Sequence, residues 1–122
     1  NFAFDSRDLL TLWLVGLPPL RRHLKMHQHA ALATRIATEL HLEPLDRETF
    51  SVMIDHGLKA SGATQKLLAD PAMELLFRSS RGVPRLASRI LRAALRRAHD
   101  KEQSFVDEAV LEQAVDETLP PA

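Results

Sequence analysis

The 122-residue sequence predicts a mainly α-helical fold, a small bundle of about four helices preceded by one or two short strands. Residues 45–122 contain helix start signals that are followed by apolar residues at helical spacing. Residues 9–15 form a short apolar run that ends at a glycine and two prolines, the pattern of a strand buried on both faces. Such a strand needs parallel neighbours, and this chain offers few. We therefore expect the sequence to be cut from a longer protein.

The first third of the chain has weaker signals. A short helix is predicted over residues 20–25, and a second over residues 27–36, where alanine and leucine favour a helix. Residues 36–42 partly alternate apolar and polar side chains. They fit an edge strand with Glu39 and His41 facing outward, and they also fit a helix.

The first strong helix signal begins at Asp46. Its carboxylate can accept hydrogen bonds from the free amides of the first turn, and Leu45 can pack on Phe50 four positions after the cap. Apolar residues then recur at helical spacing until Gly62, which is suited to end the helix.

Two further aspartates predict helix starts. Asp70 is expected to cap a helix that has Pro71 in its first turn. Asp107 is expected to cap the last helix, with Val106 packed on Leu111. Between these two helices a long one is predicted from residue 84 to about residue 99.

A sharp corner precedes that long helix. Gly82 can adopt the left-handed conformation that closes one helix, and Pro84 is pre-set for the first turn of the next. Arg85 therefore lies in an opening helical turn, where the helix dipole disfavours positive charge. We expect its guanidinium to point out of the corner toward a polyanion or a carboxylate.

The sequence Gly82-Val83-Pro84-Arg85, its Leu-Ala-Ser-Arg-Ile continuation and the acidic helix that follows resemble the sensor 2 region of AAA+ ATPases. The nearest types are the secretion-pathway ExeA ATPases and the related transposition helper ATPases. The resemblance implies that Arg85, on a small helical lid, reaches the terminal phosphate of ATP, with Gly82 and Pro84 shaping the nucleotide-binding corner. Residues 12–20 are similar to a late strand of the family's core domain and the turn after it. Residues 1–44 would then be the end of that core, and residues 45–122 the lid.

The same resemblance implies a second functional arginine. Arg35 occupies the place of an arginine finger, which a subunit offers to its neighbour's ATP. From the residues alone, Arg35 also fits an exposed arginine that the helix dipole stabilises at a helix end.

The family commonly has a polar phosphate-sensing residue where this chain has Leu17. The implied cofactors of the intact protein are ATP and Mg²⁺. The implied partners are the remainder of the AAA+ core, further copies of the chain, and DNA, a transposase or a secretion component.

Catalysis by this chain alone is not expected. Phosphate binding by an ATPase needs a glycine-rich loop that ends in Gly-Lys-Ser or Gly-Lys-Thr. The four glycines of the sequence are not followed by such a pair. We therefore expect the parent protein to be the ATPase, and the isolated chain to show neither ATP turnover nor tight nucleotide binding.

An arginine stripe gives an alternative function. Arg85, Arg89, Arg92 and Arg96 recur at steps of four, three and four, so they lie along one side of the long helix. Such a stripe suits a phosphate backbone, and Arg89, Arg92 and Arg96 would be the contacts of a stand-alone DNA-binding module. A solvated face, a face paired with the acidic last helix, and a purely structural interaction domain remain open.

Charge and composition set further limits. The net charge is zero, yet residues 78–101 hold eight basic residues against one acid, and residues 102–117 hold six acids and no base. The absence of cysteine excludes disulfides and thiolate metal sites. His23, His27 and His29 lack a nearby acid to complete a metal site, so no metal is expected. No apolar run approaches membrane-spanning length, and we expect a cytoplasmic protein without membrane insertion.

Overall fold

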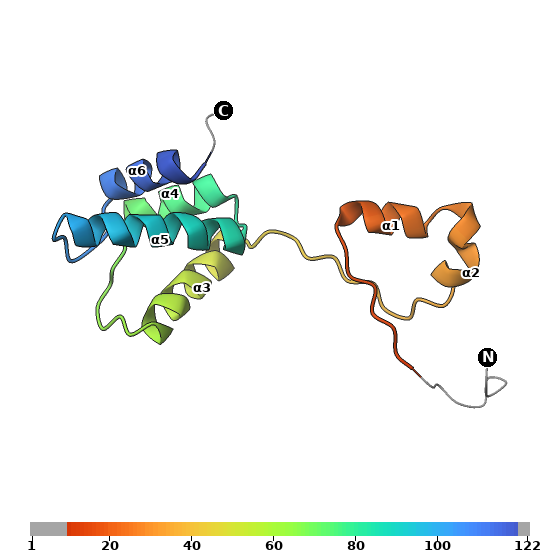
Figure 1. Cartoon of the computed structure of the whole chain (residues 1–122). Coiled ribbons are helices and arrows are strands. Elements are labelled where there is room, and N and C mark those ends of the chain that lie inside the picture. Colours follow the sequence, from red (N-terminus) through yellow and green to blue (C-terminus); the bar gives the residue numbers. More distant parts are fainter. Residues whose placement is uncertain (1–9, 120–122) are drawn as a thin grey trace. The chain divides into compact units, whose positions relative to one another are not determined.

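The computed structural model of the chain describes residues 10–119, and these confirm the mainly α-helical fold (Figure 1). The chain divides into two compact units, Asn1–His41 and Leu42–Ala122, which are described separately. The helical elements in chain order are α1 (Pro18–Leu24), the 3-10 turn η1 (His27–His29), α2 (Ala30–Ala33), α3 (Arg47–Ala60), α4 (Asp70–Ser80), α5 (Pro84–Asp100) and α6 (Glu108–Thr118).

The first unit contains short helices and, among its described residues, no buried side chain. The predicted helix over residues 20–25 corresponds to α1, which starts earlier because Pro18 and Pro19 fit a first helical turn. The predicted helix over residues 27–36 is present only as η1 and the four-residue α2. An ion pair between Arg21 and Glu39 links α1 to the segment that follows α2.

The strands expected in the first unit do not form within the described residues. Residue 9 lies outside them, and residues 10–15 have no strand partner and are exposed. Residues 36–42 are neither strand nor helix. The physical reason is the same for both segments: a strand forms by backbone pairing with a neighbour, and the described chain provides none.

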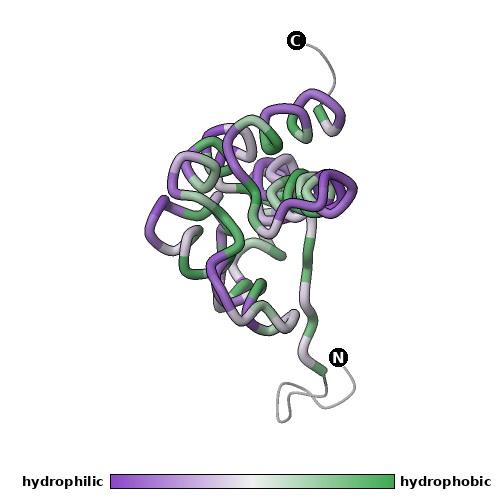
Figure 2. The backbone as a smooth tube through the Cα atoms, turned by 90° about the vertical axis from the view of Figure 1, so that its left-hand side faces the viewer, coloured by the Kyte–Doolittle hydropathy of each residue, from purple (hydrophilic) through white to green (hydrophobic). Residues whose placement is uncertain are grey.

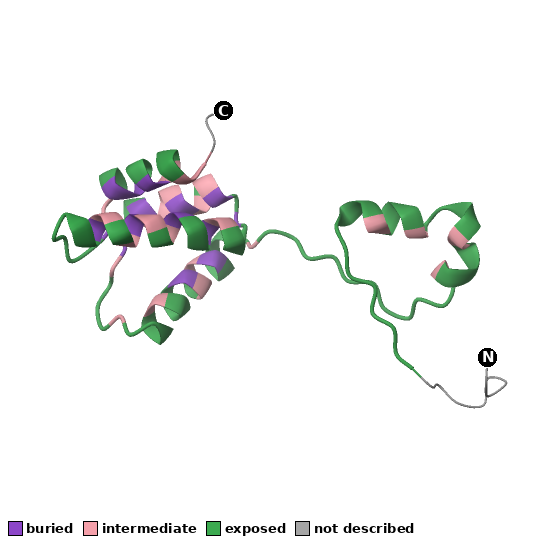
Figure 3. Ribbon diagram, in the orientation of Figure 1, coloured by how far each residue is buried: buried purple, intermediate pink, exposed green. Residues whose placement is uncertain are grey.

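The second unit contains the hydrophobic core. Helices α4, α5 and α6 pack on one another, and α3 contacts α4 (Figure 1). Their inward sides are buried and their outward sides exposed (Figure 3), and hydrophobic and hydrophilic stretches alternate along the helices (Figure 2). The largest fully buried apolar side chains are Phe50, Leu68, Leu76, Ile90, Leu111, Val106 and Val110.

Helix α5 fits closely into this core because much of its buried side is alanine. Its buried residues are Ala87, Ile90, Ala94 and Ala98, spaced at three, four and four residues. Small side chains at a contact reduce the distance between helix axes. The long helix predicted from residue 84 to about residue 99 is thus confirmed as α5.

The predicted caps are confirmed at two of the three aspartates. Asp46 accepts a hydrogen bond from the Thr49 amide at the start of α3, and Asp107 accepts one from the Val110 amide at the start of α6. The prediction for Asp70 is wrong, because the N-cap of α4 is Ala69 and Asp70 is already the first helical residue. Its carboxylate instead accepts a hydrogen bond from Lys66, and this bond lowers the pKa of Asp70.

A short backbone pairing aligns the starts of α4 and α6. Leu68 and Val106 form an isolated parallel bridge. The Ala69 amide donates to the Val106 carbonyl oxygen at 3.1 Å, and the Val106 amide donates to the Leu67 carbonyl oxygen at 2.6 Å. The chain segments that lead into the two helices are therefore fixed side by side.

No helix among the described residues is long and apolar enough to cross a membrane.

Candidate functional site at the α4–α5 corner

The turn between α4 and α5, residues 80–85, is called here the corner. Helix α4 ends at Ser80, and its C-cap Arg81 adopts the left-handed conformation with φ 52° and ψ 36°. Gly82 follows with φ 71°, so two successive residues are left-handed. The sequence predicted this conformation for Gly82 and missed it for Arg81. The Val83 amide then donates to the Ser80 carbonyl oxygen at 3.0 Å and closes the turn.

Gly82 also contacts the segment that leads into α3. The Leu45 amide donates to the Gly82 carbonyl oxygen at 2.9 Å. A Cβ atom at Gly82 would lie 2.2 Å from the Leu45 carbonyl oxygen, far inside van der Waals contact. Glycine is therefore required at the corner for its conformation and for this close approach, and the corner is fixed to the start of α3.

The first turn of α5 carries a positive charge, Arg85, that pairs with no acid among the described residues. Pro84 is its first residue, as predicted, and Arg85 its second. The N-cap Val83 provides no side-chain hydrogen bond, and the first turn has no acidic residue. The first amide of α5 that is hydrogen-bonded within the helix is that of Ala87, which donates to the Val83 carbonyl oxygen, so the amides of Arg85 and Leu86 come before it. The exposed Arg85 side chain therefore lies at the positive end of the helix dipole.

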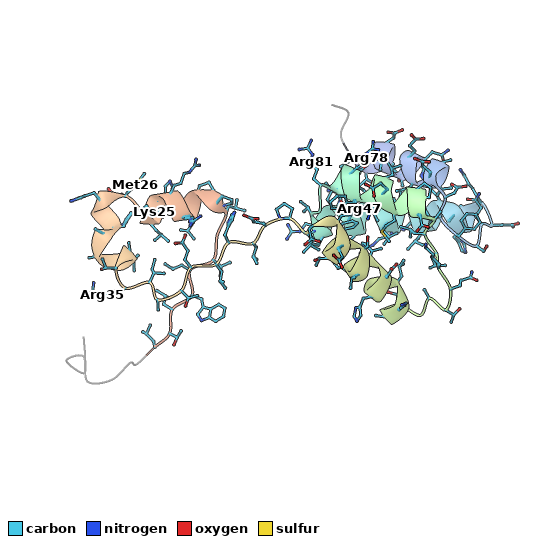
Figure 4. All side chains as sticks on the ribbon, turned by 180° about the vertical axis from the view of Figure 1, so that it is seen from behind. Lys25, Met26, Arg35, Arg47, Arg78 and Arg81 are labelled. Carbon is cyan, nitrogen blue, oxygen red and sulfur yellow. The ribbon has the colours of Figure 1, made fainter. Side chains whose placement is uncertain are left out.

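Three exposed arginines border the corner, and we call them the corner arginines. Arg78 lies in the last turn of α4, Arg81 at its C-cap and Arg85 in the first turn of α5. Arg78 and Arg81 are labelled at the same end of α4 in Figure 4. Within residues 10–119, the hydrogen bonds and ion pairs involve none of these three guanidinium groups. They are spaced by three and four residues around Gly82, a pattern present in the sequence, which by itself indicated a role for Arg85 alone.

The remaining arginines of α5 divide between two neighbours. Arg97 forms an ion pair with Glu117 of α6 at 2.8 Å, and Arg89 donates to the C-terminal backbone of α6 at 3.4 Å. The basic helix α5 therefore pairs with the acidic helix α6 on the side of Arg89 and Arg97. This pairing was one of the alternatives that the sequence left open. Arg92 and Arg96 lie on the other side, beside α3.

Arg35, the other candidate catalytic residue, belongs to the first unit, and the corner is formed without it. Arg35 lies just after α2, and its guanidinium donates to the Ala31 carbonyl oxygen of that helix at 2.9 Å. This is the geometry of an arginine that stabilises a helix end.

Leu17 is the exposed N-cap of α1. Among the described residues, no three histidines, cysteines or acids are grouped as metal ligands would be.

The second unit is therefore a small helical module that presents exposed arginines at the turn between two helices, one of them in the first turn of α5. The sequence is similar to general secretion pathway protein A of Aeromonas hydrophila, with 33% identity over 95 residues. The match covers 78% of this chain and 17% of that protein, so the chain spans about a sixth of its relative's length. No protein-family model matches the chain, and no solved structure does.

Proposed function

We propose that residues 45–122 are the sensor 2 lid of an AAA+ ATPase and that Arg85 contacts the terminal phosphate of ATP. The observation that carries the proposal is the position of Arg85 in an exposed first helical turn without a capping side chain or an acid. A cation placed against the helix dipole lacks local compensation, and a phosphate group compensates both the guanidinium and the free amides.

The corner has the parts needed to bind a polyanion and to respond to it. Arg78 and Arg81 extend the positive region beyond Arg85. The hydrogen bond and close contact between Gly82 and Leu45 connect this region to the start of α3. A shift of the corner toward a bound phosphate would therefore displace the segment that joins the lid to the preceding residues, which couples the lid position to the nucleotide state.

The parent protein is proposed to hydrolyse ATP with Mg²⁺ and to act as an oligomer in assembling a secretion complex. The similarity to a protein named for the general secretion pathway favours secretion over transposition as the process. In such an oligomer Arg35 would act on the ATP of a neighbouring subunit. The hydrogen bond from Arg35 to Ala31 would have to break for that role.

Measuring ATP hydrolysis by the isolated chain and by the full-length gene product tests whether ATP hydrolysis requires residues outside this chain. The 122-residue chain lacks a phosphate-binding loop. Purified by itself, it should release no inorganic phosphate from ATP above a no-protein control, whereas the full-length gene product should. Turnover by the isolated chain that is lost on changing one of its own residues would contradict the proposal, and so would a full-length product without ATPase activity.

A further inference from the structure

A groove separates α3 from α5 in the second unit. We call its apolar lining the groove floor, and the groove has a volume of about 620 Å³. The residues of the floor are Met53, Ile54, Leu58, Leu91 and Leu95. All but Ile54 are only partly buried, so the core does not cover them.

The groove is open because α3 is attached mainly through its N-terminal half. The rings of Phe50 and Phe77 meet edge to face, with centroids 5.2 Å apart and planes at 66°. Arg47 Nε lies 2.6 Å from Glu74 Oε2, and Leu45 bonds to the corner. Beyond these contacts α3 slants away from α5, as Figure 1 shows. The apolar side of its C-terminal half is therefore left facing the groove.

The charges at the groove edges are asymmetric. Arg92 and Arg96 line the α5 edge one helical turn apart, and both are exposed. The α3 edge includes Gly57 and Ser61, which carry no charge. An acid, Asp100, lines only the far end, where His99 Nδ1 lies 3.4 Å from its carboxylate. The middle of the groove therefore combines an apolar floor with one cationic edge.

We propose that this groove binds an amphipathic helix of a partner protein, one with an apolar stripe bordered on one side by carboxylates. Apolar side chains at positions i, i+3, i+4 and i+7 would lie on the floor. The carboxylates would pair with Arg92 and Arg96 and fix the orientation of the helix. The α5 edge extends from Ser88 to Asp100, about 18 Å at 1.5 Å per residue, enough for about three turns of a bound helix.

Charge complementarity and the floor together favour an acidic helix over DNA. A phosphate backbone could pair with Arg92 and Arg96, but it would leave the apolar floor in contact with water or with charged oxygens. The groove lining contains no tryptophan, tyrosine or phenylalanine on which a base could stack. This binding role is separate from the proposed nucleotide contact, because the groove lining does not include the corner arginines.

A labelled peptide tests the proposal directly. A 16-residue synthetic helix with leucines at i, i+3, i+4 and i+7 and glutamates along one side is titrated with the 122-residue chain, and fluorescence anisotropy reports binding. We expect saturable binding that Arg92→Glu/Arg96→Glu weakens at least tenfold. A peptide with lysine in place of glutamate should bind at least tenfold more weakly to the unchanged chain. The matched control Arg22→Glu/Lys25→Glu, which changes as many exposed charges in the other unit, should stay within twofold.

Four kinds of outcome would overturn the proposal. One is the absence of binding at concentrations up to 1 mM, with the chain shown to be folded by circular dichroism. Another is equal affinity for the lysine peptide, or equal loss in the control variant. A third is that the chain binds a duplex DNA probe, that Arg92→Glu/Arg96→Glu abolishes this binding, and that the peptide does not compete with the DNA. That result would assign the groove to nucleic acid. The last is a concentration-dependent dimer that the same double variant dissociates, which would assign the groove to a second copy of the chain.

Discussion

At the level of single residues, the corner depends on glycine at position 82. The backbone there has φ 71°, and the space where a side chain would begin is occupied by the Leu45 carbonyl group. A left-handed residue other than glycine costs roughly 1–2 kcal/mol, before any contact with neighbouring backbone is counted. The contact between Gly82 and Leu45 also involves two backbone segments, which cannot rotate away as a flexible side chain could.

Gly82→Ala should therefore lower the free energy of unfolding by at least about 2 kcal/mol. The matched control is Gly57→Ala in the last turn of α3, where an added Cβ meets no atom within 4 Å. Alanine favours a helix interior over glycine by about 0.5–1 kcal/mol, so this change should stabilise the chain. Urea unfolding of both variants is the measurement. Equal small effects at the two positions would show that the corner is not tightly packed.

Single residues were predictable where their role is local. Asp46 and Asp107 were recognised as caps because a cap bonds within three residues of itself. At Asp70 the prediction is wrong, because Ala69 occupies the cap position and the Asp70 carboxylate pairs with Lys66. Arg81 was missed because left-handed arginine has no distinctive sequence signal.

At the level of elements, the start of α3 should make stability depend on pH. The Thr49 amide, followed by the Thr49 hydroxyl, donates to the Asp46 carboxylate and lowers its pKa below 3.8. The unfolded chain thus binds a proton at this site at higher pH than the folded chain does. The stabilisation is present above about pH 4 and is lost as the pH falls through the lowered pKa.

Asp46→Asn should flatten this acid dependence, because asparagine caps a helix without titrating. The expected result is a melting temperature close to that of the unchanged chain at pH 7 and a smaller decrease between about pH 4 and pH 2. Circular dichroism melts at several pH values measure it. Asp55→Asn, an exposed change in the middle of α3, serves as the control. An acid dependence unchanged by Asp46→Asn would mean that the cap does not control it.

The helices of the second unit were largely predictable, and the strands were not. Caps, prolines and apolar spacing act within one helix, so the sequence alone located α3, α5 and α6. A strand requires a partner strand, and for residues 10–15 and 36–42 the described chain contains none. The groove was not predicted, because the angle between α3 and α5 depends on contacts distant in sequence, such as that between Phe50 and Phe77.

At the level of the whole molecule, the core belongs to the second unit alone. Every buried residue of the core lies between Phe50 and Ala114, and no described residue before Leu42 is buried. Residues 42–122 alone should therefore unfold cooperatively, with a melting temperature within a few degrees of that of the whole chain. Circular dichroism melts of the two chains make the comparison. A truncated chain that melts without a sharp transition would show that the first unit contributes to the core.

The proposed role of Arg85 is to act on nucleotide, and not to stabilise the fold of the second unit. Its side chain is exposed and lies in the first turn of α5, where positive charge is unfavourable. The most direct measurement is ATP hydrolysis by the full-length gene product carrying Arg85→Ala, together with the melting temperature of the 122-residue chain carrying the same change. Lys59→Ala, which removes another exposed cation of the second unit, is the control.

For Arg85→Ala we expect a melting temperature changed by no more than a degree or two, and ATP hydrolysis reduced at least tenfold, a loss of about 1.4 kcal/mol of transition-state stabilisation. Lys59→Ala should leave both quantities nearly unchanged. The contrary result is a chain that Arg85→Ala unfolds, with normal ATP turnover per folded molecule of the full-length product. That result would make Arg85 a structural residue of the corner and would refute the sensor 2 assignment.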